Sequence, residues 1–396
     1  MALMNTLETA IKKLPVVCGI AALMTLGMNA KAMAAILYDI TDLGILPSAT
    51  RTYASGLNDL GQVVGTAYGD RYRRGFLWSE STGMKDLGFL QTQYPTSSAS
   101  DINNAGQVVG TVDGYFAEYI LAGSRPFFWS NDTGMVALAL SSNYKDGFGI
   151  TINNSGQVLG NVQGGLTSMS FVWSQSTGET YLNLNGYLGD NEYLYANDIN
   201  DNGQLVGSIG NYYPPEGRAF LGSINGIITE IGTLPGRDFS GASLINNVGQ
   251  VVGTSYNLDN ELNVIDNSTF LWSITSGMTD IEYYFYPTDI NDSGQVVGSF
   301  DGSPLVWSSS DGIVYLNTVI NPSQDWKLIG ANAINEKGQI AATGINQSGQ
   351  TRALLLTPRS GEAVPEPMTI GSTLLAGAGL AYLRRRQLLS SSKVAE

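Results

Sequence analysis

The chain has 396 residues, in which 34 Asp and Glu outnumber 20 Lys and Arg, with no His and a single Cys. This acidic balance argues against a nucleic-acid partner, because phosphate contacts need clustered Lys and Arg. The lack of His removes the commonest general base and a usual zinc ligand, and one Cys cannot form an internal disulfide. The sequence therefore predicts neither a metal nor another cofactor, and its 48 Gly and 20 Tyr favour a β-rich protein.

The first 34 residues have the order of a secretory signal peptide. Lys12 and Lys13 precede an apolar stretch over 14–28, and small residues suited to signal peptidase follow at 30, 32 and 34. Cys18 lies inside the apolar stretch and follows Val17, whereas a lipoprotein cysteine follows a small residue, so lipidation is not favoured. We expect the chain to be exported.

A ten-residue motif, INNAGQVVGT at 102–111, occurs in seven close copies whose Gln residues are 44–50 residues apart. Its Asn can bond the backbone two residues on, and its Gly suits a positive φ, so each copy predicts a tight turn before a strand. The Asn residues are Asn58, Asn103, Asn153, Asn200, Asn246, Asn291 and Asn335. The Gly residues are Gly61, Gly106, Gly156, Gly203, Gly249, Gly294 and Gly338. The Gln residues are Gln62, Gln107, Gln157, Gln204, Gln250, Gln295 and Gln339.

Each copy is followed by a stretch like FLWSESTGM at 76–84, and most units close with a stretch like KDLGFL. A unit thus predicts four strands with short turns between the first and second and between the third and fourth. A repeat of this length built from short strands is typical of a β-propeller. The repeated tryptophans, which we predict to pack between blades, are Trp78, Trp129, Trp173, Trp272 and Trp307, with Gly222 at the equivalent place in the fourth unit.

The two ends of the repeat region predict how the ring closes. The last unit lacks a fourth strand, and residues 37–46 resemble a fourth strand with no unit before them. Pairing 37–46 with the strand around Arg352–Leu356 would complete the last blade and leave no open edge. We therefore predict an all-β domain at 35–361: a seven-bladed β-propeller of four-stranded antiparallel blades, closed by an N-terminal strand.

The paired Asn-x-x-Gly-Gln-Val-Val-Gly and Phe-Leu-Trp motifs resemble the HAF family of bacterial extracellular repeats over about 37–357. This resemblance implies export and a propeller-like fold. The family is defined by its repeats, so it implies no reaction.

The segment 362–396 resembles a PEP-CTERM sorting signal. It has Val364-Pro365-Glu366-Pro367, a short apolar stretch from Met368 to Leu383 that we expect to be helical and membrane-inserted, and Arg384-Arg385-Arg386. The resemblance implies processing by an exosortase, transient membrane association and a cell-surface or extracellular location in a Gram-negative-type bacterium. Ten further residues follow the arginines here, whereas such signals usually end sooner.

Without its two ends, the body at 35–364 has 13 basic and 31 acidic residues, a net charge of −18. Its long, variable connections should all lie on one face, and they are rich in aromatics. We predict a ligand platform of Tyr212, Tyr213, Tyr284 and Tyr286, with packing of these rings on one another as the alternative. The ligand could be a polysaccharide, including exopolysaccharide.

Acidic residues leave other readings open. Asp and Asn in DINN and DIND (101–104, 198–201, 289–292) fit turns better than calcium, since calcium needs six to eight converging oxygens. Asp259, Glu261 and Asp266 form a denser cluster, which fits a solvated loop. No catalytic motif is present, so we expect a non-enzymatic binding protein. The alternatives are a carbohydrate-active enzyme with carboxylates near the channel, and a purely structural envelope protein.

Overall fold

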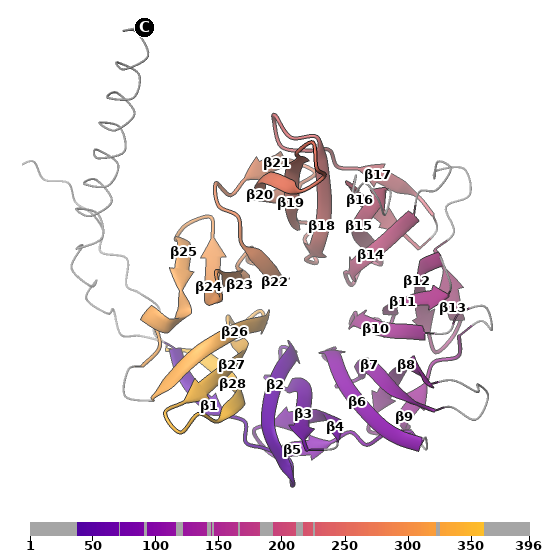
Figure 1. Ribbon diagram of the computed structural model, residues 1–396, viewed down its shortest axis with the longest axis vertical. Helices are drawn as coiled ribbons and strands as arrows, with labels where there is room; N and C mark the ends of the chain where they lie inside the picture. The colour runs from indigo at the N-terminus through magenta and orange to yellow at the C-terminus, as the bar shows by residue number, and fades with distance from the viewer. Residues whose placement is uncertain are drawn as a thin grey trace, which may run out of the picture. The chain divides into compact units, whose positions relative to one another are not determined.

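The computed structural model describes residues 38–70, 72–90, 93–115, 122–140, 144, 146–164, 167–182, 193–210, 217–224, 226–321 and 325–359. The segments predicted as signal peptide and sorting tail lie outside these residues. The described strands form seven four-stranded antiparallel sheets arranged as blades around a centre (Figure 1). The predicted propeller is thus confirmed. Within the described residues, no helix has the length and apolar content that crossing a membrane requires.

The first strand of each blade lies nearest the centre (Figure 1). Blade 1 is β2 (Ala49–Leu57), β3 (Val63–Gly69), β4 (Arg73–Ser79) and β5 (Gly83–Asp86). Blade 2 is β6 (Gln93–Ile102), β7 (Val108–Tyr115), β8 (Ala122–Ser130) and β9 (Gly134–Ala137). Blade 3 is β10 (Asp146–Ile152), β11 (Val158–Gly164), β12 (Thr167–Ser174) and β13 (Gly178–Tyr181). Blade 4 is β14 (Tyr193–Ile199), β15 (Gln204–Gly210), β16 (Gly217–Ser223) and β17 (Ile228–Glu230).

The remaining blades follow the same order. Blade 5 is β18 (Phe239–Ile245), β19 (Val251–Leu258), β20 (Val264–Ser273) and β21 (Gly277–Asp280). Blade 6 is β22 (Tyr286–Ile290), β23 (Val296–Phe300), β24 (Ser303–Ser308) and β25 (Gly312–Tyr315), followed by the 3-10 turn η1 (Leu316–Thr318). Blade 7 is β26 (Trp326–Ile334), β27 (Ile340–Asn346), β28 (Thr351–Pro358) and, as its outer strand, β1 (Tyr38–Asp42).

The ring closes as the sequence predicts. β1 pairs antiparallel with β28, with Tyr38 opposite Pro358 and Asp42 opposite Leu354. Tyr38 and Ile40 are buried, and the Arg359 guanidinium bonds the Asp39 carboxylate at 2.6 and 2.8 Å. The outer strand of the last blade is therefore supplied by the opposite end of the repeat region, which removes an unpaired edge.

Local packing explains the repeated sequence. Both valines of the motif are fully buried, as Val63 and Val64 show, because each side of the second strand faces a neighbouring blade. A Cβ added at Gly110 would lie 2.1 Å from the Ser98 carbonyl oxygen, so only glycine fits beneath the Phe127 ring. In blade 7 the same pairing is Ala342 opposite Leu354, where a smaller side chain replaces the ring.

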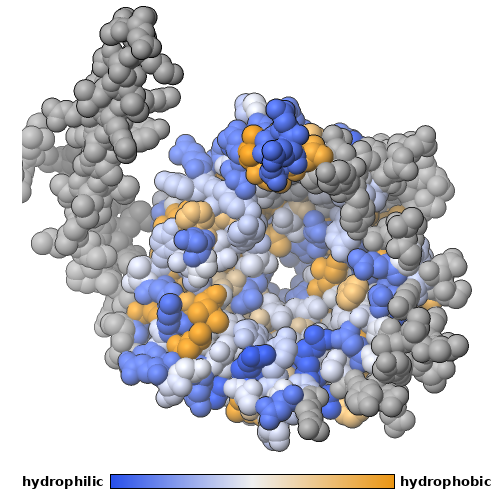
Figure 2. Space-filling view, viewed as in Figure 1, coloured by the Kyte–Doolittle hydropathy of each residue, from blue (hydrophilic) through white to orange (hydrophobic). Residues whose placement is uncertain are grey.

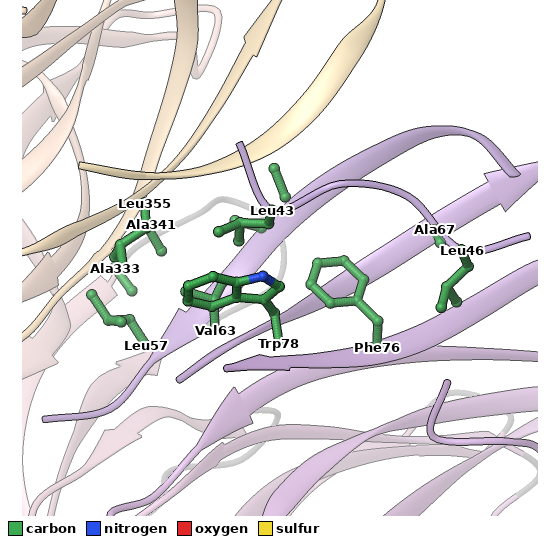
Figure 3. Close-up of a cluster of buried hydrophobic side chains, with 12 residues drawn as sticks. Leu43, Leu46, Leu57, Val63, Ala67, Phe76, Trp78, Ala333, Ala341 and Leu355 are labelled. Carbon is green, nitrogen blue, oxygen red and sulfur yellow. The ribbon is translucent and has the colours of Figure 1, made fainter. Parts of the chain in front are cut away.

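Apolar side chains fill the spaces between blades. Between blades 7 and 1, Phe76 and Trp78 pack with Ala341 and Leu355, and with Leu43 from the link that follows β1 (Figure 3). The predicted role of the tryptophans is confirmed: Trp78, Trp129, Trp272 and Trp307 are buried, and Trp173 packs against the neighbouring core cluster while half-buried. The core is thus a ring of separate inter-blade clusters.

The motif Asn residues also join the blades. The Asn58 side chain accepts from the backbone N–H groups of Leu60 and Gln62, which fixes its own turn, and its Nδ2 donates to the Asn103 carbonyl of the next blade at 3.0 Å. The same inter-blade bond recurs at every step and ends with Asn335 donating to the Asn58 carbonyl at 3.1 Å. We call this closed circle of seven bonds the Asn ring.

A second circle runs beside the first. The backbone N–H of the residue after each motif Asn donates to the side chain of the equivalent residue in the next blade. The seven residues in this second ring are Asp59, Asn104, Asn154, Asp201, Asn247, Asp292 and Glu336. We call the face that carries both rings the tight-turn face and the opposite one the variable-loop face.

Candidate functional site

The predicted tyrosine platform is described only in part. Tyr212 and Tyr213 lie outside the described residues. Tyr284 and Tyr286 lie at the start of β22, on the variable-loop face, with ring centroids 5.0 Å apart and planes at 72°. Phe285 between them is fully buried, and its backbone N–H and C=O both bond the Thr269 hydroxyl at 3.1 Å, which fixes the segment.

The two tyrosines differ in exposure. Tyr286 is 62% exposed, whereas Tyr284 is half-buried. Burial, together with the hydrogen bond and charge of Tyr286, raises the pKa of Tyr284 well above its ordinary value. Tyr284 therefore stays a neutral hydroxyl, and Tyr286 offers its ring to solvent.

Tyr286 belongs to a set of four aromatic residues, of which the sequence analysis named only Tyr286 itself. The second strand of each blade carries the motif's Val-Val-Gly. The residue directly after that glycine pairs with one residue of the inner strand. In four of the seven blades this residue is aromatic: Tyr53, Phe148, Tyr195 and Tyr286. We call these four the aromatic row. Phe148 is 36% exposed, and Tyr53 and Tyr195 are half-buried.

The aromatic row lies beside the central channel. The inner strands surround the centre, and an opening passes between them in the space-filling view (Figures 1 and 2). Alternate residues of these strands, such as Thr52 and Ser97, are buried and bond the preceding blade. The row belongs to the other, partly exposed set, and its member Tyr286 begins its strand at the variable-loop face.

Three carboxylates lie further along the inner strands, near the tight-turn face. Asp101, Asp198 and Asp289 each directly precede the Ile-Asn of the motif, in blades 2, 4 and 6. One oxygen of each accepts the N–H of the following Ile at 2.8 Å. The other accepts the N–H of Ile152, Ile245 or Ile334 in the next blade at 2.8–3.0 Å.

These contacts correct the prediction that the Asp and Asn of DINN and DIND serve turns throughout. The Asn makes the turn, but the Asp side chain connects two inner strands. Asp101 also accepts the Thr151 hydroxyl of the next blade at 2.7 Å. A register shift next to each Asp, such as the one between Ala196 and Asp198, moves it out of the strand's ordinary alternation.

Burial raises the pKa of all three carboxyls. For Asp198 the pKa rises to about 7, because burial and the Asp101 charge outweigh the two backbone N–H bonds that lower it. Asp289 is raised by burial and by the charges of Asp101 and Asp198. The three groups therefore form one electrostatically linked set around the channel. Within the described residues, no group of three acidic or sulfur ligands has a metal-binding arrangement.

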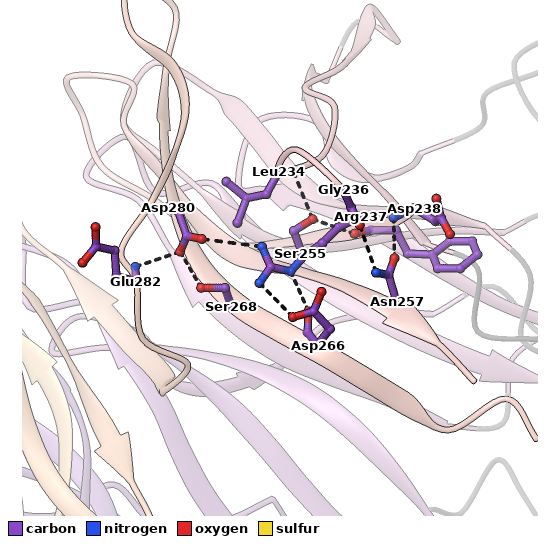
Figure 4. A network of polar contacts seen from close by, with 11 residues as sticks. Leu234, Gly236, Arg237, Asp238, Ser255, Asn257, Asp266, Ser268, Asp280 and Glu282 are labelled. Carbon is purple, nitrogen blue, oxygen red and sulfur yellow. Dashed lines mark hydrogen bonds and ion pairs between the residues drawn. The ribbon is translucent and has the colours of Figure 1, made fainter. Parts of the chain in front are cut away.

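The acidic loop 259–266 is an internally bonded turn. Asp259 accepts the N–H groups of Glu261 and Asn263, and these bonds lower the pKa of its carboxyl. Asp266 pairs with Arg237, which also reaches Asp280 at 3.5 Å (Figure 4). These carboxylates serve local structure, in agreement with the predicted loop.

An eighth Asn-x-x-Gly-Gln turn lies on the variable-loop face, in the connection between β27 and β28. Asn346 accepts the Gln350 N–H at 2.9 Å, and its Nδ2 bonds Gln350 Oε1 at 3.0 Å, as in the seven repeats. The sequence signal, INQSGQ at 345–350, was plain but overlooked. The Asn-x-x-Gly-Gln motif therefore specifies the conformation of a turn, and it occurs on both faces of the ring.

Comparison with known proteins adds the fold alone. No family model and no curated protein matches the chain. Among solved structures, oligogalacturonate lyase from Vibrio parahaemolyticus is similar, with 12% identity and a TM-score of 0.53 over 80% of this chain and 93% of that one. Streptogramin B lyase has 9% identity and a TM-score of 0.50 over 82% and 99%. Acylaminoacyl peptidase from Pyrococcus horikoshii has 7% identity and a TM-score of 0.50, over 80% of this chain and 54% of that one.

Proposed function

We propose that this protein is an exported, non-enzymatic propeller that binds a carbohydrate chain at the variable-loop mouth of its channel. The aromatic row carries the proposal. Tyr53, Phe148, Tyr195 and Tyr286 present partly exposed rings from equivalent positions of four rigid strands. Tyrosine combines an apolar ring face with a polar hydroxyl, which suits a ligand with both C–H faces and hydroxyl groups.

The proposed location rests on the sequence. The N-terminal segment resembles a signal peptide, and 362–396 resembles a sorting signal, so signal peptidase and an exosortase are the proposed processing partners. A surface position would bring the channel mouth to exopolysaccharide. The net charge of −18 on the body supports the view that nucleic acid is not a partner.

A second candidate function is glycan cleavage by the channel carboxylates. The pKa of about 7 for Asp198 favours it, because a general acid works best with a pKa near the operating pH. Against it, each of the three carboxylates already accepts backbone N–H groups from two blades. We therefore rank cleavage second, and a purely structural envelope role third.

Single substitutions in the aromatic row test the binding proposal. Tyr286→Ala and Phe148→Ala should each weaken glycan binding at least ten-fold, because each removes a ring offered at the channel mouth. Melting temperatures should stay close to that of the unaltered protein, since both side chains are partly exposed. Binding is measured by titration calorimetry with a glycan first identified on an array.

Tyr283→Ala is the matched control, because Tyr283 is 61% exposed on the same face but outside the row. It should bind normally. Equal binding by all three variants and the unaltered protein would reject the site. Release of new reducing ends, abolished by Asp198→Asn, would favour the enzyme instead.

A further inference from the structure

Three cationic residues lie near the variable-loop ends of blades 7 and 1. Arg51 lies near the start of β2, Lys327 near the start of β26 and Arg352 near the start of β28. All three strands begin at the variable-loop face. The Arg352 Nη1 reaches across to the Thr50 carbonyl of blade 1 at 3.5 Å, directly beside Arg51.

These cations lie next to the aromatic row. The Arg51 guanidinium carbon is 5.2 Å from the centroid of the Tyr68 ring, and Tyr68 contacts Tyr53 edge to face at 5.5 Å. Lys327 lies on the same inner strand as Ile329, a partly exposed residue beside the blade 7 counterpart of the row. In blade 1, positive charge thus lies beside an aromatic ring of the row.

No carboxylate within the described residues forms an ion pair with Arg51, Lys327 or Arg352. Five other arginines do have such partners: Arg73 with Asp113, Arg74 with Asp86, Arg218 with Glu230, Arg237 with Asp266 and Asp280, and Arg359 with Asp39. Asp325, two residues before Lys327, accepts a hydrogen bond from Gln347. Arg51, Lys327 and Arg352 therefore carry positive charge that no ion pair within the described residues offsets.

The charges of the channel are separated along its length. Arg51 precedes Gly56 by five residues, and Gly56 is the blade 1 counterpart of Asp101, Asp198 and Asp289. Five residues of strand span about 16 Å. This is about twice the Debye length of roughly 8 Å at physiological ionic strength, so the three carboxylates scarcely weaken the positive potential at the mouth.

Resting on the binding function proposed above, we infer that the ligand is an acidic glycan with carboxylate groups, and that Arg51 and Lys327 bind those carboxylates. A guanidinium offers paired donors to a carboxylate, and an ammonium offers a compact charge. The sugar rings then lie on the aromatic row while the carboxylates point to blades 7 and 1. Arg352, which is half-buried and bonds Thr50, holds the two blades in register.

The test compares two glycans that differ only in the carboxylate: cellohexaose and a β-1,4-linked glucuronate hexamer. The full chain should bind the glucuronate hexamer at least ten-fold more tightly, and this preference should shrink as sodium chloride is raised. Arg51→Gln and Lys327→Gln should each remove most of the preference. Lys337→Gln is the matched control, since Lys337 is an exposed lysine of blade 7 on the tight-turn face, and it should keep the preference.

Two results would overturn the inference while leaving the binding function in place. One is equal affinity for both hexamers, with both lost in Tyr286→Ala. The other is an unchanged preference in Arg51→Gln and Lys327→Gln. Failure to bind either hexamer, or any other glycan on an array of neutral and uronate-bearing chains, would reject the binding function as well.

Discussion

At the scale of the residue, the side-chain amide of the motif Asn makes three kinds of hydrogen bond. Its oxygen accepts the N–H groups of its own turn, and its nitrogen donates both to the motif Gln and to the next blade, as Asn246 does at 2.7 Å to Gln250 Oε1 and 3.0 Å to the Asn291 carbonyl. Aspartate could make the turn equally well, but it has no donor for the other two bonds. The inter-blade bond therefore explains why all seven motif positions are Asn.

Asn246→Asp tests this explanation. The change leaves two acceptors without a donor and places a carboxylate at a buried position, so we expect a loss of about 2–4 kcal/mol in the free energy of unfolding. Asn247→Asp is the control in the same turn, because Asp201 and Asp292 already occupy that place in neighbouring blades. It should cost below about 1 kcal/mol. Chemical denaturation measures both, and equal losses would contradict the role of the Asn ring.

The channel carboxylates predict a pH dependence of stability. In the unfolded chain Asp198 releases its proton near pH 4, whereas in the folded protein its pKa is about 7. The folded state thus holds more protons between these values, and stability should fall as pH rises from about 4 to 7 and then level off. Asp101 and Asp289 shift in the same direction.

Asp198→Asn removes one titrating group from this set, so it should flatten the slope of melting temperature against pH. Asp132→Asn, a change at an exposed turn residue, should keep the slope of the unaltered protein. An unchanged slope in Asp198→Asn would mean that this carboxyl does not titrate as its surroundings imply.

At the scale of the element, the strand that closes the ring is formed by residues far from its partner in sequence. Tyr38, Ile40, Leu43 and Leu46 are all buried against the last and first blades. Fully burying such a side chain contributes about 1.5–3 kcal/mol, and a protein's total stability is only about 5–15 kcal/mol. Burial of the segment 38–46 therefore contributes a large share of the protein's stability.

Deletion of residues 38–46 should lower the melting temperature strongly and speed amide hydrogen exchange in β28, whose outer edge would be exposed. Exchange in blade 3, on the far side of the ring, should change less. Asp39→Asn, which removes only the ion pair with Arg359, should have little effect because exposed ion pairs contribute little. An identical melting curve after the deletion would show that β1 does not hold the ring closed.

Most elements could be predicted because their signals are local. A residue such as Gly106, with a φ of 73°, marks its turn, and consecutive buried residues such as Val108 and Val109 mark the strand after it. The aromatic row could not be predicted in the same way. Tyr53 and Tyr195 lie where the units differ most, and the register shift in each inner strand hides which side faces the channel. The role of Asp198 was missed for a related reason, since its partner is 47 residues away.

At the scale of the whole molecule, the two faces of the ring differ in how much their residues change from blade to blade. The tight-turn face carries two closed circles of hydrogen bonds, so a substitution in one blade also alters the hydrogen bonds of its neighbour. The described part of the variable-loop face has no such circle, and there the blades differ in side chain from one to the next. This division lets one face preserve the ring while the other carries the proposed binding residues.

The channel carboxylates also divide the blades of the ring into pairs. They occur in blades 2, 4 and 6, and each accepts a backbone N–H from the blade that follows. These bonds join the blades in pairs, 2 with 3, 4 with 5, and 6 with 7. Blade 1 belongs to no such pair. Its residue at the carboxylate position is Gly56, and the residue at that position in blade 7 is Ala333. A Cβ at residue 56 would lie 2.9 Å from the Asp101 backbone, so no other residue fits without a shift. Blade 1, which carries Arg51 and Tyr53, is therefore joined to its neighbours without this carboxylate contact, through the Asn ring, the Arg73–Asp113 ion pair to blade 2 and the packing of the segment that follows β1.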